Sequence, residues 1–235
     1  MGLEPPPLSD DALRYLENAE SGINTIRAKE AKVPYTPDGA PDRGEQPHSL
    51  EALRAAIGEC KRCKLHKNRT SLVFGEGSPR AELVFVGEGP GQEEDMSGRP
   101  FVGEAGRLLT KIIENGMRLA RREVYICNVV KCRPPGNRDP VRDEIEACIP
   151  FLQQQLRIIG PKVICSLGRV AAQCLIGPGF KITEERGTWR SYEETPLMPT
   201  YHPAYLLRYP SAKQQVWEDI KKVMGHLGLE VKKNG

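Results

Sequence analysis

The chain has 235 residues, a length that allows one large domain with its own core, and its formal net charge of +3 does not by itself identify a nucleic-acid binder. Its 23 glycines and 20 prolines exclude a coiled coil, and its 39% of apolar residues excludes wholesale disorder. No apolar run approaches the ~18 residues that span a bilayer, and the acidic, proline-rich start does not resemble a signal peptide. These features predict a globular cytoplasmic protein without membrane contact.

The first 48 residues differ in composition from the rest of the chain. A helix with Ser9 as its N-cap is predicted from about 9 to 29, and prolines and glycines fill the stretch from 33 to 48. We therefore expect an N-terminal extension over 1–48, ending in a linker, and a separate domain over 49–235.

Short apolar runs after this linker predict buried strands. The runs lie at 83–86, closed by Gly87, at 124–127 and at 163–167, and a further strand is expected at 198–201. Helices are expected at about 104–115, at 140–159 with Asp139 as N-cap, at 169–175, and after the capping-box pair Ser211 and Gln214. Strands separated by crossover helices predict a mainly parallel sheet covered on both faces, with ligands beyond the carboxyl ends of the strands.

Three segments with chemically useful side chains lie at this edge of the predicted sheet. Gly87 opens a glycine-rich run that ends in carboxylates, Asn128 follows a strand, and His202 precedes exposed leucines and Arg208. Each feature also has a simpler interpretation, because solvated acids in a turn, a turn asparagine and a structural histidine are all common.

Taken together in chain order, the motifs identify a family. The run Gly87-Glu88-Gly89-Pro90-Gly91, the segment 98–103, the segment 128–135 and the pair His202-Pro203 resemble the family 4 uracil-DNA glycosylases. The resemblance covers roughly 50–227. It implies an α/β fold, a three-layer α/β/α sandwich with a central four-stranded mainly parallel sheet. It also implies a monomeric, monofunctional hydrolase that cleaves the N-glycosidic bond of uracil in DNA and leaves an abasic site.

The resemblance also implies roles for individual residues. Phe101 would stack on the flipped uracil, and Asn128 would recognise the edge of the base. His202 would donate a hydrogen bond to uracil O2 and stabilise negative charge as the glycosidic bond breaks. The base pocket would further be lined by Gly87, Glu88 and Gly89.

One position departs from the family pattern. The family usually has alanine where this chain has Gly89, and neither residue supplies a carboxylate to activate water. Glu94 and Glu88 are therefore the candidates for water activation. A smaller residue at this position would also affect which deaminated bases fit the pocket.

Four of the seven cysteines occur in two pairs, Cys60 with Cys63 and Cys132 with Cys148. Spacing alone allows zinc or a [4Fe–4S] cluster, since both accept four thiolates. The resemblance selects the [4Fe–4S] cluster. Packing in the core is the expected role of the remaining three, Cys127, Cys165 and Cys174.

Contacts to uracil-containing DNA are expected from two places. A basic patch around the first cysteine pair includes Lys61, Arg62 and Lys64, which we expect to contact phosphates. Leu206 occupies the position of the family's wedge residue, which fills the space of the flipped base, and Arg208 would contact phosphate.

Two other functions remain open at this point. The first is a broader glycosylase that also removes hypoxanthine or xanthine. The second is a non-catalytic iron–sulfur module that binds DNA. Retention of Phe101, Asn128 and His202 argues against the module, because it needs no uracil pocket. A covalently trapping relative needs a histidine after the Asn128 segment, and 133–140 contains none.

Overall fold

The computed structural model describes residues 47–230. The helix expected at 9–29 and nearly all of the expected linker lie outside the described residues, and the division of the chain at residue 48 stays a prediction. Within 47–230, no helix has both the length and the apolar character needed to cross a bilayer.

The strands described within 47–230 form one mixed sheet in the order β1-β3-β2-β4-β6-β5. The central strands β3, β2, β4 and β6 are parallel, whereas β1 and β5 pair antiparallel at the two edges. Their bounds are Glu76–Gly77 for β1, Leu83–Gly87 for β2, Tyr125–Asn128 for β3, Val163–Leu167 for β4, Arg190–Tyr192 for β5 and Thr195–Thr200 for β6. The expected four-stranded parallel core is confirmed, and the short edge strands add to it.

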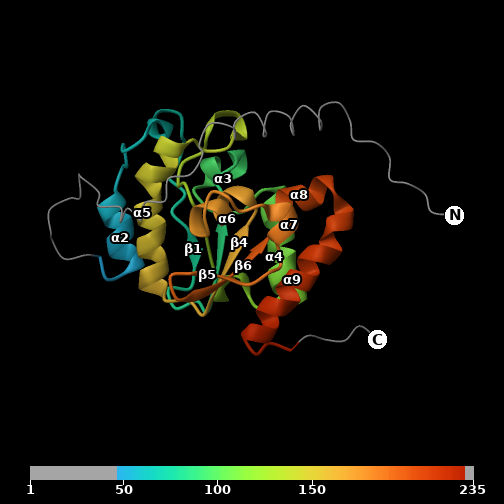
Figure 1. Ribbon diagram of the computed structural model, residues 1–235. Helices are drawn as coiled ribbons and strands as arrows, with labels where there is room; N and C mark the ends of the chain where they lie inside the picture. Colours follow the sequence, from blue (N-terminus) through green and yellow to red (C-terminus); the bar gives the residue numbers. More distant parts are fainter. Residues whose placement is uncertain (1–46, 231–235) are drawn as a thin grey trace, which may run out of the picture. The chain divides into compact units, whose positions relative to one another are not determined.

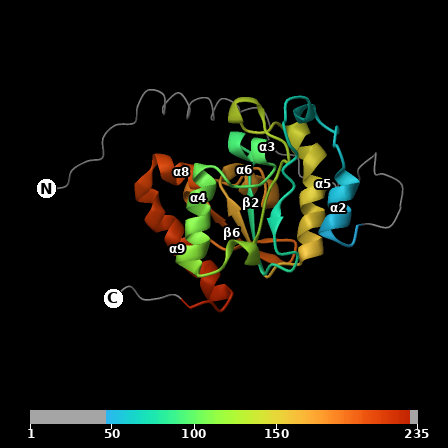
Figure 2. The ribbon, with the colours of Figure 1, turned by 180° about the vertical axis from the view of Figure 1, so that it is seen from behind.

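Helices cover both faces of the sheet, which confirms the three-layer architecture (Figures 1 and 2). One face packs against α2 (Leu50–Ile57), α5 (Arg142–Ile159) and α6 (Arg169–Leu175). The other packs against α4 (Glu104–Lys111) with the π-helical turn Ile112–Met117, α8 (Pro203–Arg208) and α9 (Lys213–His226). The remaining helical segments are α3 (Gln92–Ser97), α7 (Ile182–Glu185) and the 3-10 turns Lys64–Lys67, Arg121–Glu123, Pro135–Asn137 and Pro210–Ala212.

Two helix starts differ from the sequence prediction. The expected cap of α5, Asp139, instead forms an ion pair with Arg169, and α5 begins at Arg142. Glu144 takes over the capping, because its carboxylate accepts a hydrogen bond of 2.9 Å from the backbone N–H of Val141. Similarly, α9 begins at Lys213, since the expected capping residue lies in the preceding 3-10 turn.

Strand register places the candidate site residues at one edge. In the parallel pair β2–β3, Gly87 lies opposite Asn128, and both end their strands. His202 follows β6, whose last residue Thr200 pairs with Leu167 at the end of β4. These carboxyl ends lie at the edge of the sheet where α3 and α8 begin, at the top of Figure 1.

Candidate active site and cysteine pocket

Gly87 allows two side chains to meet at the end of β2. A Cβ atom at this position would lie 2.4 Å from Asn128 Oδ1 and 2.5 Å from Phe101 Cζ, so only glycine fits. Asn128 is 1% exposed, and its Oδ1 has no hydrogen-bond partner among the described residues. An unpaired buried acceptor costs ~1–3 kcal/mol, which points to a donor supplied by a ligand.

The backbone of Phe101 is held in an unusual conformation. Its φ of 51° lies in the left-handed region, which bulky residues seldom adopt. Gly106 of α4 packs directly beneath it, since a Cβ there would lie 2.0 Å from the Phe101 carbonyl oxygen. Arg121 fixes the loop from the other side, donating hydrogen bonds to Pro100 O (2.6 Å) and Thr110 Oγ1 (2.8 Å). The ring is therefore positioned by its surroundings.

His202 caps α8 and lies beside the Phe101 ring. Its Nδ1 accepts a hydrogen bond of 3.1 Å from the backbone N–H of Ala204, and its ring centroid lies 5.5 Å from that of Phe101. Burial lowers the pKa of His202 to about 4, with the charge of Glu94 opposing and that of Arg208 assisting the shift. The imidazole is therefore neutral at pH 7, and its hydrogen resides on Nε2, which can donate.

Glu94 ties the two sides of the pocket together. One carboxylate oxygen accepts hydrogen bonds of 2.9 Å from the N–H groups of Val102 and Gly103, and the other accepts one of 3.1 Å from Gly91. These bonds join the start of α3 to the loop that carries Phe101. Both carboxylate oxygens of Glu94 are thus engaged by backbone N–H groups.

Glu88 has different surroundings. Burial raises its pKa to about 7, and the charge of Asp139 and a hydrogen bond with it add to the increase, while Arg169 opposes it. A carboxyl group that titrates near neutrality is suited to accept a proton.

The space at Gly89 is filled rather than open. A Cβ atom there would lie 2.8 Å from Val130 Cγ2, so alanine would require this segment to shift. The Gly89 loop thus packs closely against the segment that follows Asn128.

All four predicted cysteine ligands line one pocket. Cys60, Cys63, Cys132 and Cys148 meet there and form no disulfides. Burial raises the pKa of Cys148 to about 11 and also raises that of Cys63 and Cys132. These thiols therefore stay protonated at pH 7 unless a bound metal displaces their protons.

Cationic side chains and N–H groups surround the sulfurs. Arg69 donates hydrogen bonds to Cys132 Sγ (3.2 Å) and Cys60 O (2.7 Å), and Arg62 donates one to Cys60 Sγ (3.4 Å). The backbone N–H of Lys131 donates to Cys148 Sγ at 3.3 Å. Donors of this kind stabilise thiolates.

The four cysteines bring four thiols together, the donor set that both zinc and an iron–sulfur cluster accept. Within 47–230, no three or more His, Cys, Asp or Glu side chains are arranged to hold a metal ion.

Lys131 connects the two pockets and was missed in the sequence analysis. Its side chain is 1% exposed, and its Nζ donates hydrogen bonds to Asn128 O (2.7 Å) and Gln155 Oε1 (2.5 Å). Gln155 in turn donates to Phe74 O (2.9 Å) and to Tyr125 Oη (3.1 Å). The sequence signal was a lysine directly after two valines in the segment that follows a buried strand.

The side chains of the basic patch have different partners in the structure. Arg62 lies against the Phe151 ring, 4.9 Å from its centroid, and Lys64 forms an ion pair of 3.1 Å with Asp143. Arg62 and Arg69 line the cysteine pocket. Lys61, Arg62 and Lys64 are exposed, as is Arg208 on α8.

The structure contradicts the expected exposure of Leu206. This side chain is 1% exposed and packs in the core with residues of α4 and α9. The neighbouring side chains at the surface are Leu207, 36% exposed, and Tyr209, 51% exposed.

A family model and several relatives show the family of this chain. A family model described as "Uracil DNA glycosylase superfamily" matches residues 74–221. A Type-4 uracil-DNA glycosylase of Sulfurisphaera tokodaii is 49% identical over 183 residues, covering 74% of this chain and 83% of the relative. One of Thermotoga maritima is 47% identical over 188 residues, covering 77% of this chain and 96% of the relative. One of Saccharolobus solfataricus is 43% identical over 183 residues, covering 74% of this chain and 85% of the relative.

Proposed function

Since this chain belongs to the uracil-DNA glycosylase superfamily and is a uracil-excising DNA repair glycosylase, we propose how its residues perform the hydrolysis. Asn128 and Phe101 bind the flipped base, His202 stabilises the leaving uracil, and Glu88 activates water. A cluster held by the four cysteines stabilises the fold around them. Action as a monomer and a cytoplasmic location stay predictions.

The unpartnered Oδ1 of Asn128 carries this proposal. Uracil presents an N3–H donor beside its O4 acceptor, so one amide can pair with both atoms. Cytosine presents an acceptor and a donor at these positions and would leave Oδ1 unpaired. A bidentate pair of this kind discriminates by ~1–3 kcal/mol. Hypoxanthine offers the same donor and acceptor pattern as uracil, so the pocket's size decides whether it is accepted.

His202 acts on the leaving group. As the bond at C1′ breaks, negative charge develops on the uracil ring, and a neutral Nε2–H aimed at O2 stabilises it where it appears. Because the pKa of His202 is about 4, the imidazole donates this hydrogen bond without having to carry a charge. Phe101 supports the ring from its face.

Glu88 is the better candidate for water activation. Its pKa of about 7 allows it to be ionised in the working enzyme and to take a proton from water. Glu94 is already engaged by three backbone N–H groups, which favours a role in shaping the pocket.

The cysteine pocket would hold a [4Fe–4S] cluster. Cys60, Cys63, Cys132 and Cys148 would be its ligands, and such a cluster supplies four metal–sulfur bonds that cross-link distant parts of the chain. Here those parts are the segment after α2, the segment after β3 and helix α5. For DNA contact we propose Lys61, Arg62, Lys64 and Arg208 on phosphates. For the wedge we propose Leu207, because it is exposed whereas Leu206 is buried.

The test uses oligonucleotides that carry uracil, hypoxanthine, xanthine or cytosine at one position. We expect alkali-labile abasic sites with uracil and none with cytosine. Asn128→Asp should lower activity on uracil by ~10–100-fold, which matches the discrimination of a bidentate pair. Asn128→Gln keeps the amide group on a longer side chain and therefore controls for shape at this packed site. Binding of uracil DNA without excision would identify the non-catalytic module instead. Unchanged activity of Asn128→Asp would remove Asn128 from base recognition.

A further inference from the structure

Three tyrosines form a stacked row beside the candidate active site. The ring centroids of Tyr201 and Tyr205 lie 4.6 Å apart with 32° between their planes, and those of Tyr205 and Tyr209 lie 4.6 Å apart with 36° between theirs. The spacing of four residues keeps the rings on one side of the chain as it passes through α8. The row therefore extends from the His202 turn to the surface.

The inner end of the row is fixed. The guanidinium of Arg186 lies 5.3 Å from the Tyr201 ring centroid and forms a hydrogen-bonded ion pair with buried Asp219. Asp219 also accepts a hydrogen bond of 2.6 Å from Thr200, the last residue of β6. Tyr201 and Tyr205 are both partly buried, so Tyr209 is the exposed end of the row.

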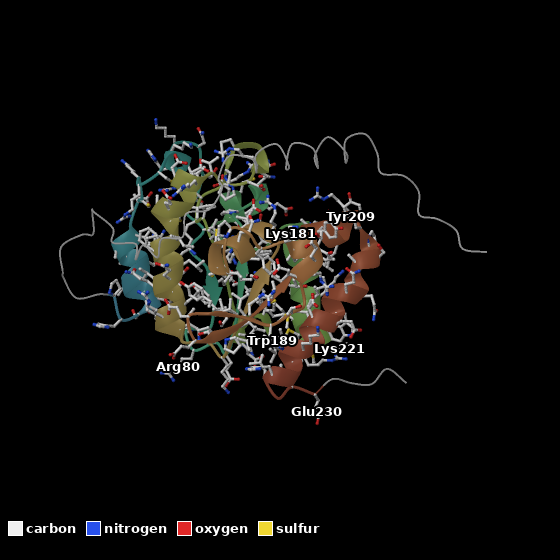
Figure 3. The ribbon with its side chains drawn as sticks, in the orientation of Figure 1. Arg80, Lys181, Trp189, Tyr209, Lys221 and Glu230 are labelled. Atoms are coloured by element: carbon white, nitrogen blue, oxygen red, sulfur yellow. The ribbon has the colours of Figure 1, made fainter. Side chains whose placement is uncertain are left out.

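The outer end of the row is open. Tyr209 is 51% exposed, and its ring stacks on that of Tyr205 alone. Figure 3 shows Tyr209 beside α8, at the end of the molecule where the parallel strands terminate. The exposed cation Arg208 is its chain neighbour, and its charge acts on both His202 and Tyr205. An aromatic face beside a cation suits a nucleotide, with its flat base and its phosphate.

The distance between His202 and Tyr209 indicates how far from the target uracil a nucleotide at Tyr209 would lie. His202 and Tyr209 flank the helix Pro203–Arg208, and a helical rise of ~1.5 Å per residue separates them by roughly 10 Å along its axis. Stacked bases of one strand are ~3.4 Å apart, so the same distance covers about three nucleotides.

We propose that this row is a stacking platform for single-stranded DNA, on which an unpaired base about three nucleotides from the target uracil lies against Tyr209. The proposal rests on the proposed uracil-excising function. Arg208 would contact the phosphate next to this base. Because every base has a flat face, the platform would act without sequence preference. In duplex DNA the bases are already stacked in pairs, so the contact favours single strands or frayed sites.

The experiment measures single-turnover excision as a function of protein concentration, with a single-stranded oligonucleotide that contains one uracil. Tyr209→Ala should raise the half-saturating concentration about tenfold, the effect of losing one stacked base, and leave the maximal rate unchanged. Tyr209→Phe keeps the aromatic face and should behave as the wild type. Lys221→Ala, on α9 below Tyr209 in Figure 3, is the control for a partly exposed substitution outside the row.

A second series of oligonucleotides locates the contact. Each carries an abasic spacer at one position between one and five nucleotides from the uracil, on either side. The wild type should bind more weakly when the spacer lies at one position about three nucleotides away, and Tyr209→Ala should be insensitive to that spacer. Equal sensitivity of both proteins at every position would overturn the platform. A lower maximal rate together with a lower melting temperature in both Tyr209 variants would overturn it too, because the ring would then be structural. Failure of the wild type to excise uracil would instead overturn the proposed function.

Discussion

The base pocket and the cysteine pocket are joined by the short segment 128–132, yet their polar groups are satisfied in opposite ways. In the base pocket, Asn128 Oδ1 has no partner among the described residues and Phe101 has a left-handed backbone. In the cysteine pocket, three of the sulfurs accept N–H groups at 3.2–3.4 Å. The first region is less stable than it could be and has a polar group available to a bound base. The second region surrounds its cysteine sulfurs with hydrogen-bond donors. Changes in the cysteine pocket should therefore affect folding, and changes in the base pocket should affect rate and selectivity.

The largest effect is expected from Cys148→Ser. Loss of one buried ligand should release iron and lower the melting temperature strongly, because metal-binding free energy in such sites is folding free energy. Cys174→Ser, outside the pocket, is the matched control and should keep about four irons per chain. Iron content and thermal melts measure both. A Cys148→Ser protein with full iron and unchanged melting, or a wild type that contains one zinc, would show that the region is not a cluster site.

Glu88→Gln should reduce the single-turnover rate by ~10²–10⁴, the usual contribution of a general base. A base works only when unprotonated, so with a pKa of about 7 the wild-type rate should fall about tenfold for each pH unit below 7. The variant should show a low rate without this dependence. Glu94→Gln, by contrast, should lower thermal stability and keep the pH dependence. If the acid limb survives in Glu88→Gln, another group activates water.

His202→Ala should reduce the single-turnover rate by ~10²–10³, while iron content and DNA affinity stay close to those of the wild type. Its pKa of about 4, below the usual 6.5, means that protonation of His202 should affect activity only near pH 4. Rates measured from pH 4 to 9 with the wild type and the variant test both statements. A variant that keeps the wild-type rate would place the charge stabilisation elsewhere.

The smallest effect is expected from Lys131→Met. This variant tests whether Lys131 supports the base pocket or the cysteine pocket. The change leaves Asn128 O and Gln155 Oε1 without their donor, so we expect about a tenfold lower excision rate with iron content retained. Lys162→Met, at an exposed lysine, controls for the loss of a charge. Loss of iron with an intact rate in the remaining loaded protein would assign Lys131 to the cysteine pocket.

Much of the sheet was predictable because its central strands are buried on both faces and therefore appear as continuous apolar runs. The runs at Leu83–Gly87 and Val163–Leu167 match the structure closely, and the register that sets Gly87 against Asn128 follows from parallel pairing. The edge strands β1 and β5 are too short and too exposed to give such a signal. The convergence of four cysteines on one pocket was likewise predictable from the motif pattern.

Other features depend on contacts that no local pattern reports. Leu206 and Leu207 are adjacent on α8 and point about 100° apart, so only the packing of the helix decides which one is buried. The bond from Lys131 to Gln155 joins residues from different elements, and nothing near either residue indicates it. Asp139 is similar, because its pairing with Arg169 on α6 prevents the capping that its position suggested.

Gly106 makes the base pocket a poor target for one common route to heat resistance. Glycine inside a helix is usually replaced by alanine, which favours the helical state by ~0.5–1 kcal/mol. In α4 the added methyl group would instead lie 2.0 Å from the carbonyl oxygen of Phe101 and push away the residue that supports the base. Positions 101 and 106 are therefore constrained as a pair. A variant in which only the glycine is replaced would keep its helix and have a disordered binding site.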